Sequence, residues 1–405
     1  MAEIQEENIS GLATSFQNIY AFFVAFIVIL NSGYYRSTAK DSYLPLILFM
    51  CFIFGAFFLK FPNVMEQKID LTVTLLAMGI VFSVLANPSL TNALSGFRVL
   101  ITMFCAYIFT HIVTLQDFVK YFTVQIKVII VLSVLLQLLM LAGVSNFPKL
   151  NNYYDLFIVT TRSSDRACGV FWEPGVFSSM IVISMLFEYY ISKNKITVSG
   201  LLLYVLGIYI TKSAAGYLLL FIVLFGLVWR KTTKSNKKHF YKIIFIAIIV
   251  SIAITYENIV VFLVDLNPDV FEKLIETNSA TTSTRINSPL INLQIFLDKP
   301  VFGWGFTGSS AEFLQRVHSI NDTKIVAQTS TSTQIMASIG ILGVVYTIAF
   351  LIPAFSKKKL AQLTFETKAL ISICMLLIVN KEPHVFIVAS WLVLFYTNQS
   401  KEMIL

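Results

Sequence analysis

TQIMASIGILGVVYTIAFLIPAF, residues 333–355, contains no charged side chain. A helix needs about 20 residues to cross about 30 Å of hydrocarbon, so this stretch predicts a membrane-spanning helix. Similar apolar runs recur along the 405-residue chain, which is 57% hydrophobic and 13% charged, with a mean hydropathy of +0.77. Soluble domains carry about 25% charged residues, so the composition indicates a polytopic membrane protein.

The apolar runs predict about twelve transmembrane helices. The first run begins near Phe16 without a small-residue cleavage site after it, so we interpret it as a span and not as a signal peptide. The run from Ile196 to Trp229 is too long for one span, and a tight turn near Lys212 divides it into two short helices. The predicted spans are residues 16–35, 43–59, 71–86, 97–115, 122–144, 170–191, 196–211, 213–229, 240–256, 333–355, 367–380 and 384–398.

Lysine and arginine in short loops predict the orientation. The strongest cluster, RKTTKSNKKHFYK at 230–242, and a second at 357–359 indicate cytoplasmic loops. Successive loops of a multi-pass protein lie on alternate sides of the membrane. This rule places residues 60–70, 117–120 and 193–195 on the cytoplasmic side, together with both termini. These short basic clusters account for the net charge of +8 better than nucleic-acid binding does.

Two long segments, 145–169 and 257–332, then lie outside. The second is longer than a plain connection, which predicts a functional loop or a small subdomain. Within it we expect a helix at 288–298, with Ser288 as the N-cap and Pro289 at the first helical position. The expected fold is all-α and has three parts: spans one to nine in residues 1–256, one large extracytoplasmic loop in 257–332, and spans ten to twelve in 333–405.

Charged residues beside apolar spans are costly to desolvate, which makes them site candidates. The densest group, TTRSSDRACGVFWEPG at 160–175, includes Arg162, Arg166 and Glu173. Since Pro174 opens an apolar run, Glu173 lies at a helix N-terminus, where the macrodipole favours a negative charge. The simpler alternative is that Glu173 only caps this helix and that the arginines form an interfacial girdle.

Arg285 stands just before the predicted helix at 288–298. A guanidinium beside free helix amides suits phosphate oxygens, although a surface salt bridge is an equal alternative. Lys212 lies on the same predicted side and would add a cation. His318 is a candidate base in the outer loop, where a histidine is usually only solvated, and for His384 a capping role is as plausible as any other.

The four cysteines, Cys51, Cys105, Cys168 and Cys374, lie far apart and have no ligand-like spacing. The sequence therefore predicts neither a disulfide nor a metal site, and we expect no cofactor.

Three strings resemble the O-antigen ligase and polymerase superfamily of bacterial surface-polysaccharide assembly: RACGVFWEPGVFSS at 166–179, TRINSPLINLQIFLDKPVFGWGF at 284–306 and TSTSTQIMASIGILGVVY at 329–346. TKSAAG at 211–216 adds weaker support. The first string has the Glu-Pro-Gly form common among the polymerases. The resemblance implies a glycosyltransferase C-like fold.

One position separates the branches of this superfamily. In the ligases, a histidine precedes the paired glycines, here Gly340 and Gly343, by eleven positions, and this chain has Thr329 followed by Ser330 there. The resemblance therefore favours the polymerase branch, with a ligase as the same-family alternative. A lipid-linked oligosaccharide flippase or other transporter is the alternative from another class, although transporters usually place ionisable groups at the midplane of the membrane.

For function, the resemblance implies polymerisation of undecaprenyl-diphosphate-linked repeat units of O-antigen, capsule or exopolysaccharide. Block transfer would occur without a metal at the outer face of a bacterial inner membrane, and a chain-length regulator and a flippase are the implied protein partners. Arg166 and Arg285 would stabilise the leaving diphosphate. Glu173 would orient them or accept a proton, with His318 as the reserve base. The remaining predicted substrate-binding residues are Arg162, Lys212 and Thr329.

Overall fold

A computed structural model describes residues 18–31, 46–55, 70–144, 158–159, 166–171, 173–192, 197–232, 280–319, 328–357, 360, 363–381 and 384–398. Two helices, Asn18–Asn31 and Leu46–Gly55, come first. The later elements are α4 (Leu71–Ala86), α5 (Leu90–Ile112), α6 (Leu115–Leu141), β1 (Ile158–Val159), β2 (Arg166–Ala167), α7 (Pro174–Leu186), the π-helix η1 (Phe187–Ile191), α8 (Val198–Thr211), α9 (Ala214–Thr232), α13 (Ala280–Asp298), α14 (Phe306–Ser319), α15 (Thr331–Ile339), the 3₁₀-helix η2 (Gly340–Gly343), α16 (Val344–Phe355), α17 (Phe365–Lys381) and α18 (Val388–Asn398). The predicted span 240–256 lies outside the described residues.

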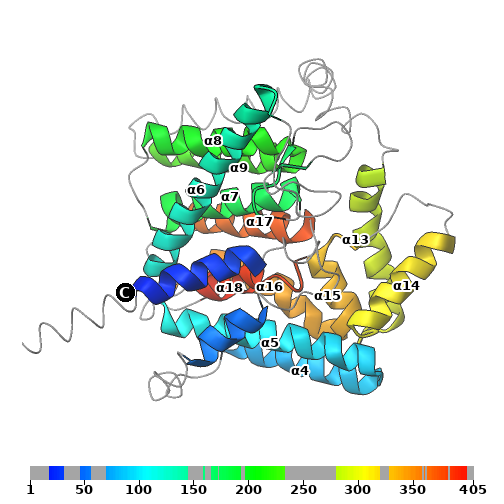
Figure 1. Ribbon diagram of the computed structural model, residues 1–405. Coiled ribbons are helices and arrows are strands. Elements are labelled where there is room, and N and C mark those ends of the chain that lie inside the picture. Colours follow the sequence, from blue (N-terminus) through cyan, green and yellow to red (C-terminus); the bar gives the residue numbers. More distant parts are fainter. Residues whose placement is uncertain are drawn as a thin grey trace, which may run out of the picture.

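The described part of the chain is a bundle of apolar helices (Figure 1). By length and composition, four of its helical segments could cross a membrane: α5, α6, α7 with η1, and α15 through α16. Large side chains such as Leu135 and Leu138 on α6 are more than half exposed, which suits contact with lipid. The chain is thus a mostly helical multi-pass membrane protein, and the number of twelve spans stays a prediction. The short antiparallel pair β1–β2 is a small departure from an all-α fold.

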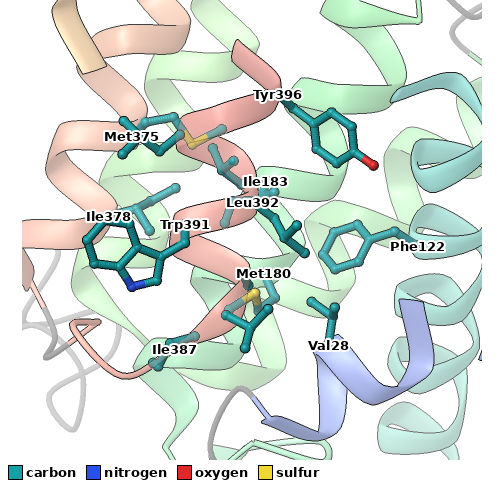
Figure 2. Close-up of a cluster of buried hydrophobic side chains, with 14 of the residues drawn as sticks. Val28, Phe122, Met180, Ile183, Met375, Ile378, Ile387, Trp391, Leu392 and Tyr396 are labelled. Carbon is teal, nitrogen blue, oxygen red and sulfur yellow. The ribbon is translucent and has the colours of Figure 1, made fainter. Parts of the chain in front are cut away.

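Helix α18 lies inside the apolar core. Figure 2 shows Trp391 and Tyr396 of α18 among apolar side chains from α6, α7 and α17. Their polar atoms are satisfied, because the Trp391 indole N–H donates to the carbonyl of Val385 at 2.9 Å and the Tyr396 hydroxyl donates to that of Val113 at 3.0 Å. A buried polar group without a partner would cost about 1–3 kcal/mol, so these bonds help to fix the position of α18.

The turn predicted near Lys212 is confirmed. Helix α8 ends at Thr211, Lys212 adopts a left-handed conformation with φ of 46°, and α9 begins at Ala214. Ser213 stabilises the start of α9, because its side-chain oxygen accepts a hydrogen bond from the backbone N–H of Gly216 at 3.3 Å.

The boundary between α5 and α6 differs from the prediction. We expected a span at 97–115 and a loop at 117–120, but the break falls at residues 113–114 and the charged positions 117–120 belong to α6. The reason is a helix cap. The Thr114 hydroxyl accepts from the Asp117 backbone N–H at 3.2 Å and donates to the Asp117 carboxylate at 2.8 Å.

The span predicted at 333–355 is broken at Gly340, where φ is +70°. Here residues 300–305 pack backbone against backbone on residues 338–341, an arrangement that we call the glycine interlock. An added Cβ on Gly340 would lie 2.2 Å from a backbone oxygen of the facing segment, and one on Gly303 would lie 2.4 Å from one. Only glycine fits at these two positions.

Hydrogen bonds attach the glycine interlock to α4. The Gly305 N–H donates to the carbonyl of Ser338 at 2.9 Å, and the Ser83 hydroxyl of α4 donates to the same carbonyl at 2.6 Å. The side-chain amide of Asn87 donates to the carbonyl of Gly303 at 3.0 Å. Residues 300–305 are therefore fixed to the bundle at the end of α4.

The helix predicted at 288–298 is longer than expected. Helix α13 begins at Ala280, so Pro289 lies inside it and Ser288 is not its N-cap. Proline has no N–H to donate to the carbonyl four residues back, which removes one helical hydrogen bond. The Ser288 hydroxyl instead accepts a hydrogen bond from the backbone N–H of Thr329 at 2.9 Å, so a tertiary contact uses the group that we expected to cap the helix.

Candidate functional site

The connection between α17 and α18 brings the candidate segments together. We call the last two residues of α17, 380–381, together with residues 384–387 of the connection the α17–α18 junction. The side-chain oxygen of Asn380 accepts hydrogen bonds from the Ser330 hydroxyl at 2.8 Å and from the Ser332 backbone N–H at 3.1 Å. Since Ser330 precedes α15, the junction holds the N-terminus of this short helix.

His384 is buried in the same junction, with 1% of its surface exposed. The last span was predicted to begin at residue 384, but α18 begins at Val388. The carbonyl of His384 accepts from the Ser390 hydroxyl at 2.9 Å, which anchors the junction to the first turn of α18. Its backbone N–H donates to the Thr331 hydroxyl at 2.7 Å, two residues beyond Thr329, the position at which the ligases carry their histidine.

Lys381 connects the junction to α7 and α9. Its Nζ donates to the Ser178 hydroxyl at 3.0 Å, and Ser178 lies 3.3 Å from the hydroxyl of Ser213 at the start of α9. Lys381 is 9% exposed and Ser178 is fully buried. This polar contact therefore lies within the helix bundle, at the end of α7 where Glu173 stands.

Arg166 reaches the α8–α9 turn from β2. Its Nε donates to the carbonyl of Thr211 at 3.1 Å, at the C-terminal end of α8, where the macrodipole favours a cation. Lys212 follows directly in the left-handed conformation described above. The structure thus brings Arg166 and Lys212 to one turn. This agrees with the prediction that both residues lie on the same side of the membrane.

Glu173 occupies the N-cap position of α7, as predicted, and Pro174 follows at the first helical position. Its side chain makes no capping hydrogen bond. Glu173 therefore does not cap α7 through a side-chain hydrogen bond, whereas its position still allows the interaction of its charge with the helix macrodipole.

The other predicted residues are placed less completely. Thr329 is 8% exposed and lies between α13 and the junction. Arg285 lies in α13, less than one turn before Ser288, and His318 lies near the end of α14, but the side chains of both are outside the described part of the chain. Arg162 is also outside it. The structure therefore brings Arg166, Lys212, Glu173 and Thr329 toward the α17–α18 junction, and the side-chain positions of the other three stay predictions.

A further cation faces the junction from α5. The guanidinium carbon of Arg98 lies 4.8 Å from the ring centroid of Phe386, within cation–π range. The sequence contained a signal for it, because Arg98 is a single arginine in the apolar run 97–115, and ionisable residues inside spans are usually functional or paired.

Comparison with family models gives one match: residues 199–348 match the family described as O-antigen ligase. These residues form an O-antigen ligase-like domain. The match supports the resemblance to the O-antigen ligase and polymerase superfamily. The domain includes α8, α9, α13, α14, α15 and η2, whereas the string at 166–179 and the α17–α18 junction lie outside it. A comparison with curated proteins found no match.

A chain of buried amides crosses the O-antigen ligase-like domain from α13 to α15. The Gln328 side-chain N–H donates to the Asn292 oxygen at 2.8 Å, and the Gln334 side-chain N–H donates to the Gln328 oxygen at 3.0 Å. Sequence analysis did not single out these residues, since amides in apolar surroundings carry no spacing signal. They link the start of α15 to α13, in addition to its contact with the α17–α18 junction.

The arrangement as a whole has clear chemical properties. Among the described residues, three cations, Arg166, Lys212 and Lys381, and one carboxylate, Glu173, belong to segments that are linked to the first turns of α7. Cations at a helix N-terminus suit an anion with several oxygens. In the described part of the chain, no three histidine, cysteine, aspartate or glutamate side chains gather as metal ligands would.

Proposed function

We propose that the chain is a polymerase of undecaprenyl-diphosphate-linked oligosaccharide repeat units, acting by block glycosyl transfer at the outer face of a bacterial inner membrane. The O-antigen ligase-like domain at residues 199–348 is the observation that carries this proposal, because it implies lipid-linked glycan substrates. The cationic segments beside the α7 N-terminus supply a fitting environment for the diphosphate.

The proposed reaction exchanges one bond at the anomeric carbon of the growing glycan. Its bond to the diphosphate oxygen breaks, and the diphosphate leaves with the electron pair. A bond forms to a sugar hydroxyl of the incoming repeat unit, and the proton of this hydroxyl passes to a base. Arg166 and Arg285 would stabilise the charge that develops on the leaving group, and Lys212 and Thr329 would bind substrate. Glu173 is the proposed base or positioning group, with His318 in reserve.

The polymerase is favoured over the ligase by Thr329, which stands where the ligases have a histidine. One observation favours the second candidate, a ligase that moves the glycan onto lipid A core or a protein. The backbone N–H of the buried His384 donates to the Thr331 hydroxyl, so a histidine from the connection between α17 and α18 lies close to that same position. A comparison of glycan products separates the two, because a polymerase makes long chains and a ligase transfers existing ones.

The proposed topology has about twelve spans, both termini in the cytoplasm and the 257–332 segment outside, in a glycosyltransferase C-like arrangement. Cysteine labelling at Lys234 and Glu312 tests it, with Lys234 expected to react from the cytoplasm and Glu312 from outside. Labelling of both positions from the same side would contradict the twelve-span order and the outer site.

Deletion of the gene and complementation by the wild-type chain test the activity. We expect the deletion strain to accumulate single lipid-linked repeat units at the outer face and to lose long glycans. A ligase defect would leave long lipid-linked chains, and a flippase defect would trap single units in the inner leaflet. Long lipid-linked chains would therefore favour the ligase over the polymerase, and trapped single units would favour the flippase.

A further inference from the structure

The outward side of α13 carries an apolar stripe. Leu290, Leu293 and Leu297 lie three and four residues apart, so they share one side of the helix. The stripe continues beyond the helix end into Val301 and Phe302. Within the part of the chain that the structure describes, each of these five side chains is more than a third exposed. Such a group of large apolar side chains indicates a surface that contacts an apolar partner.

The exposed side of α13 is divided along its length. Gln294 and Asp298 are also exposed, and at 3.6 residues per turn they lie beside the stripe. Asp298 pairs with Arg316 of α14, so this polar half faces α14. The remaining side of the helix, which includes Asn292 and Ile295, is buried. Helix α13 therefore presents an apolar half and a polar half to its surroundings, as helices at a boundary between lipid and water do.

The stripe meets the exposed face of α4. The rings of Phe302 and Phe82 pack edge to face, with their centroids 6.3 Å apart. Phe82 and Leu85 lie in the last turns of α4 and are themselves exposed. Because α4 is a predicted span whose C-terminal end faces outward in the proposed topology, lipid is the expected neighbour of these two side chains. The contact between Phe82 and Phe302 extends this apolar surface from the span to the stripe.

A lysine and a tryptophan lie at the place where the stripe meets α4. The Nζ of Lys299 lies 3.8 Å from the ring centroid of Trp304, and it donates to the side-chain oxygen of Asn87, the C-cap of α4, at 3.4 Å. Tryptophan is enriched where a membrane meets water, and lysine extends its ammonium group from apolar surroundings to this level. In Figure 1, α13 lies at one end of the bundle and runs across the direction of α4, α5 and α17. A helix in this orientation lies along a membrane surface and does not cross it.

We propose that the apolar stripe of α13, together with Val301 and Phe302, lies in the outer leaflet of the membrane and contacts lipid acyl chains. This inference goes beyond the proposed function and uses only its topology, in which residues 257–332 lie outside. It places α13 of the O-antigen ligase-like domain at the level of the lipid headgroups. The diphosphate of a lipid-linked substrate lies at the same level, because its polyprenyl chain is held in the hydrocarbon.

Spin-label accessibility tests the inference on the full chain in nanodiscs of phosphatidylcholine and phosphatidylglycerol. The exposed Cys51 is replaced by serine, and the other three cysteines are buried. A nitroxide is then attached to one introduced cysteine at a time: Leu293→Cys or Leu297→Cys in the stripe, Gln294→Cys on the polar half of α13, and Gln315→Cys on the exposed surface of α14. The measured quantities are the collision rates of the nitroxide with oxygen, which concentrates in lipid, and with a water-soluble nickel chelate.

Labels at positions 293 and 297 should collide mainly with oxygen and should lie about 5–10 Å into the boundary between headgroups and acyl chains, the depth of interfacial helices. Labels at positions 294 and 315 should collide mainly with the nickel chelate, because these positions face water. Gln294→Cys is the matched control, since it lies on the same helix only three residues from Leu297. Val301→Cys repeats the test outside α13, where the label cannot disturb the helix.

Three outcomes overturn the inference and leave the proposed function intact. Collisions mainly with nickel at positions 293, 297 and 301 would place the stripe in water. Few collisions with either reagent there would show that protein covers it, from a second copy or from another part of this chain. Collisions mainly with oxygen at position 294 as well would immerse the whole exposed side of α13. Labelling of Glu312 from the cytoplasm would instead contradict the outer site and the outer leaflet together.

Discussion

The glycine interlock and the α17–α18 junction both join segments that are far apart in the sequence, but they use opposite means. The interlock brings residues 300–305 against 338–341 through backbone contacts so close that two glycines leave no room for a Cβ atom. The junction joins α7, α15 and α17 through side chains, with Asn380 and Lys381 as the central donors and acceptors.

This difference distinguishes two groups of residues in the strings that resemble the superfamily. One group holds helices together, and the other could contact a substrate. In the Pro-Val-Phe-Gly-Trp-Gly string the Trp304 indole N–H donates to the carbonyl of Ile295 at 3.1 Å, and the paired glycines contact backbone atoms, so both strings contribute to packing. The residues that we propose to contact the diphosphate, Arg166 and Lys212, come instead from the string at 166–179 and from the α8–α9 turn.

The largest expected effect follows from Gly340→Ala, which places a Cβ in the interlock. The φ and ψ of Gly340, +70° and −147°, are close to a region that is essentially restricted to glycine, at about 1–3 kcal/mol for other residues, and the clash with a backbone oxygen adds to this cost. We expect little folded protein by fluorescence size-exclusion chromatography. Gly308→Ala is the control, because its Cβ would meet nothing closer than 3.6 Å. Normal folding of Gly340→Ala would refute the interlock.

A smaller but specific effect is expected from Arg166→Lys and Arg285→Lys at normal protein level. Lysine keeps the charge but lacks the planar paired donors that match phosphate oxygens, so each variant should polymerise about tenfold to a hundredfold more slowly. The control is Arg316→Lys, since Arg316 pairs with Glu312 and Asp298 at the surface and should be within about twofold of wild type. Wild-type chain lengths in both test variants would remove these arginines from the site.

Asn380→Ala should have an intermediate effect on the junction. It leaves the Ser332 N–H without its acceptor and should destabilise the protein by about 1–3 kcal/mol, with a lower midpoint of thermal unfolding. Asn380→Asp keeps an acceptor oxygen for both donors and should restore most of the loss. If the Asn380→Ala and Asn380→Asp variants unfold at the same temperature, the hydrogen bonds that Asn380 accepts do not hold α15 in place.

The smallest effect is expected from His318→Ala. His318 lies near the end of α14 and not at the position of the ligase histidine, so glycan ladders on a gel should change by no more than about twofold. Complete loss of ladders at normal abundance would make His318 the base and return the ligase-like mechanism to consideration.

The sequence predicted the features that depend on local patterns. Apolar runs predicted the multi-pass class, the charge near Lys212 predicted the α8–α9 turn, and Pro174 predicted the place of Glu173. The Thr114 cap was also readable, because threonine with an acidic residue three positions later is a helix-start pattern. The uniform hydropathy of 333–355 instead hid the break at Gly340.

The junction could not be predicted in the same way, because its role comes from contacts across long sequence separations. Lys381 meets Ser178, which lies 203 positions away, and Asn380 meets Ser330, 50 positions away. Its string NKEPH reads locally as an ordinary loop between two spans. Only the packing of α7, α15 and α17 gives these residues a common location.

The attachment of the glycine interlock to α4 sets an order for biogenesis. Ser83 and Asn87 are synthesised more than 200 residues before their partners Ser338 and Gly303. The ribosome must therefore deliver the chain beyond Ile341 before the interlock can close, and until then Ser83 of α4 and Asn87, which caps the end of α4, lack these partners. In a nascent chain that stops before this point, these side chains would have to find partners elsewhere, so we expect assembly of the bundle to wait for residues 338–341.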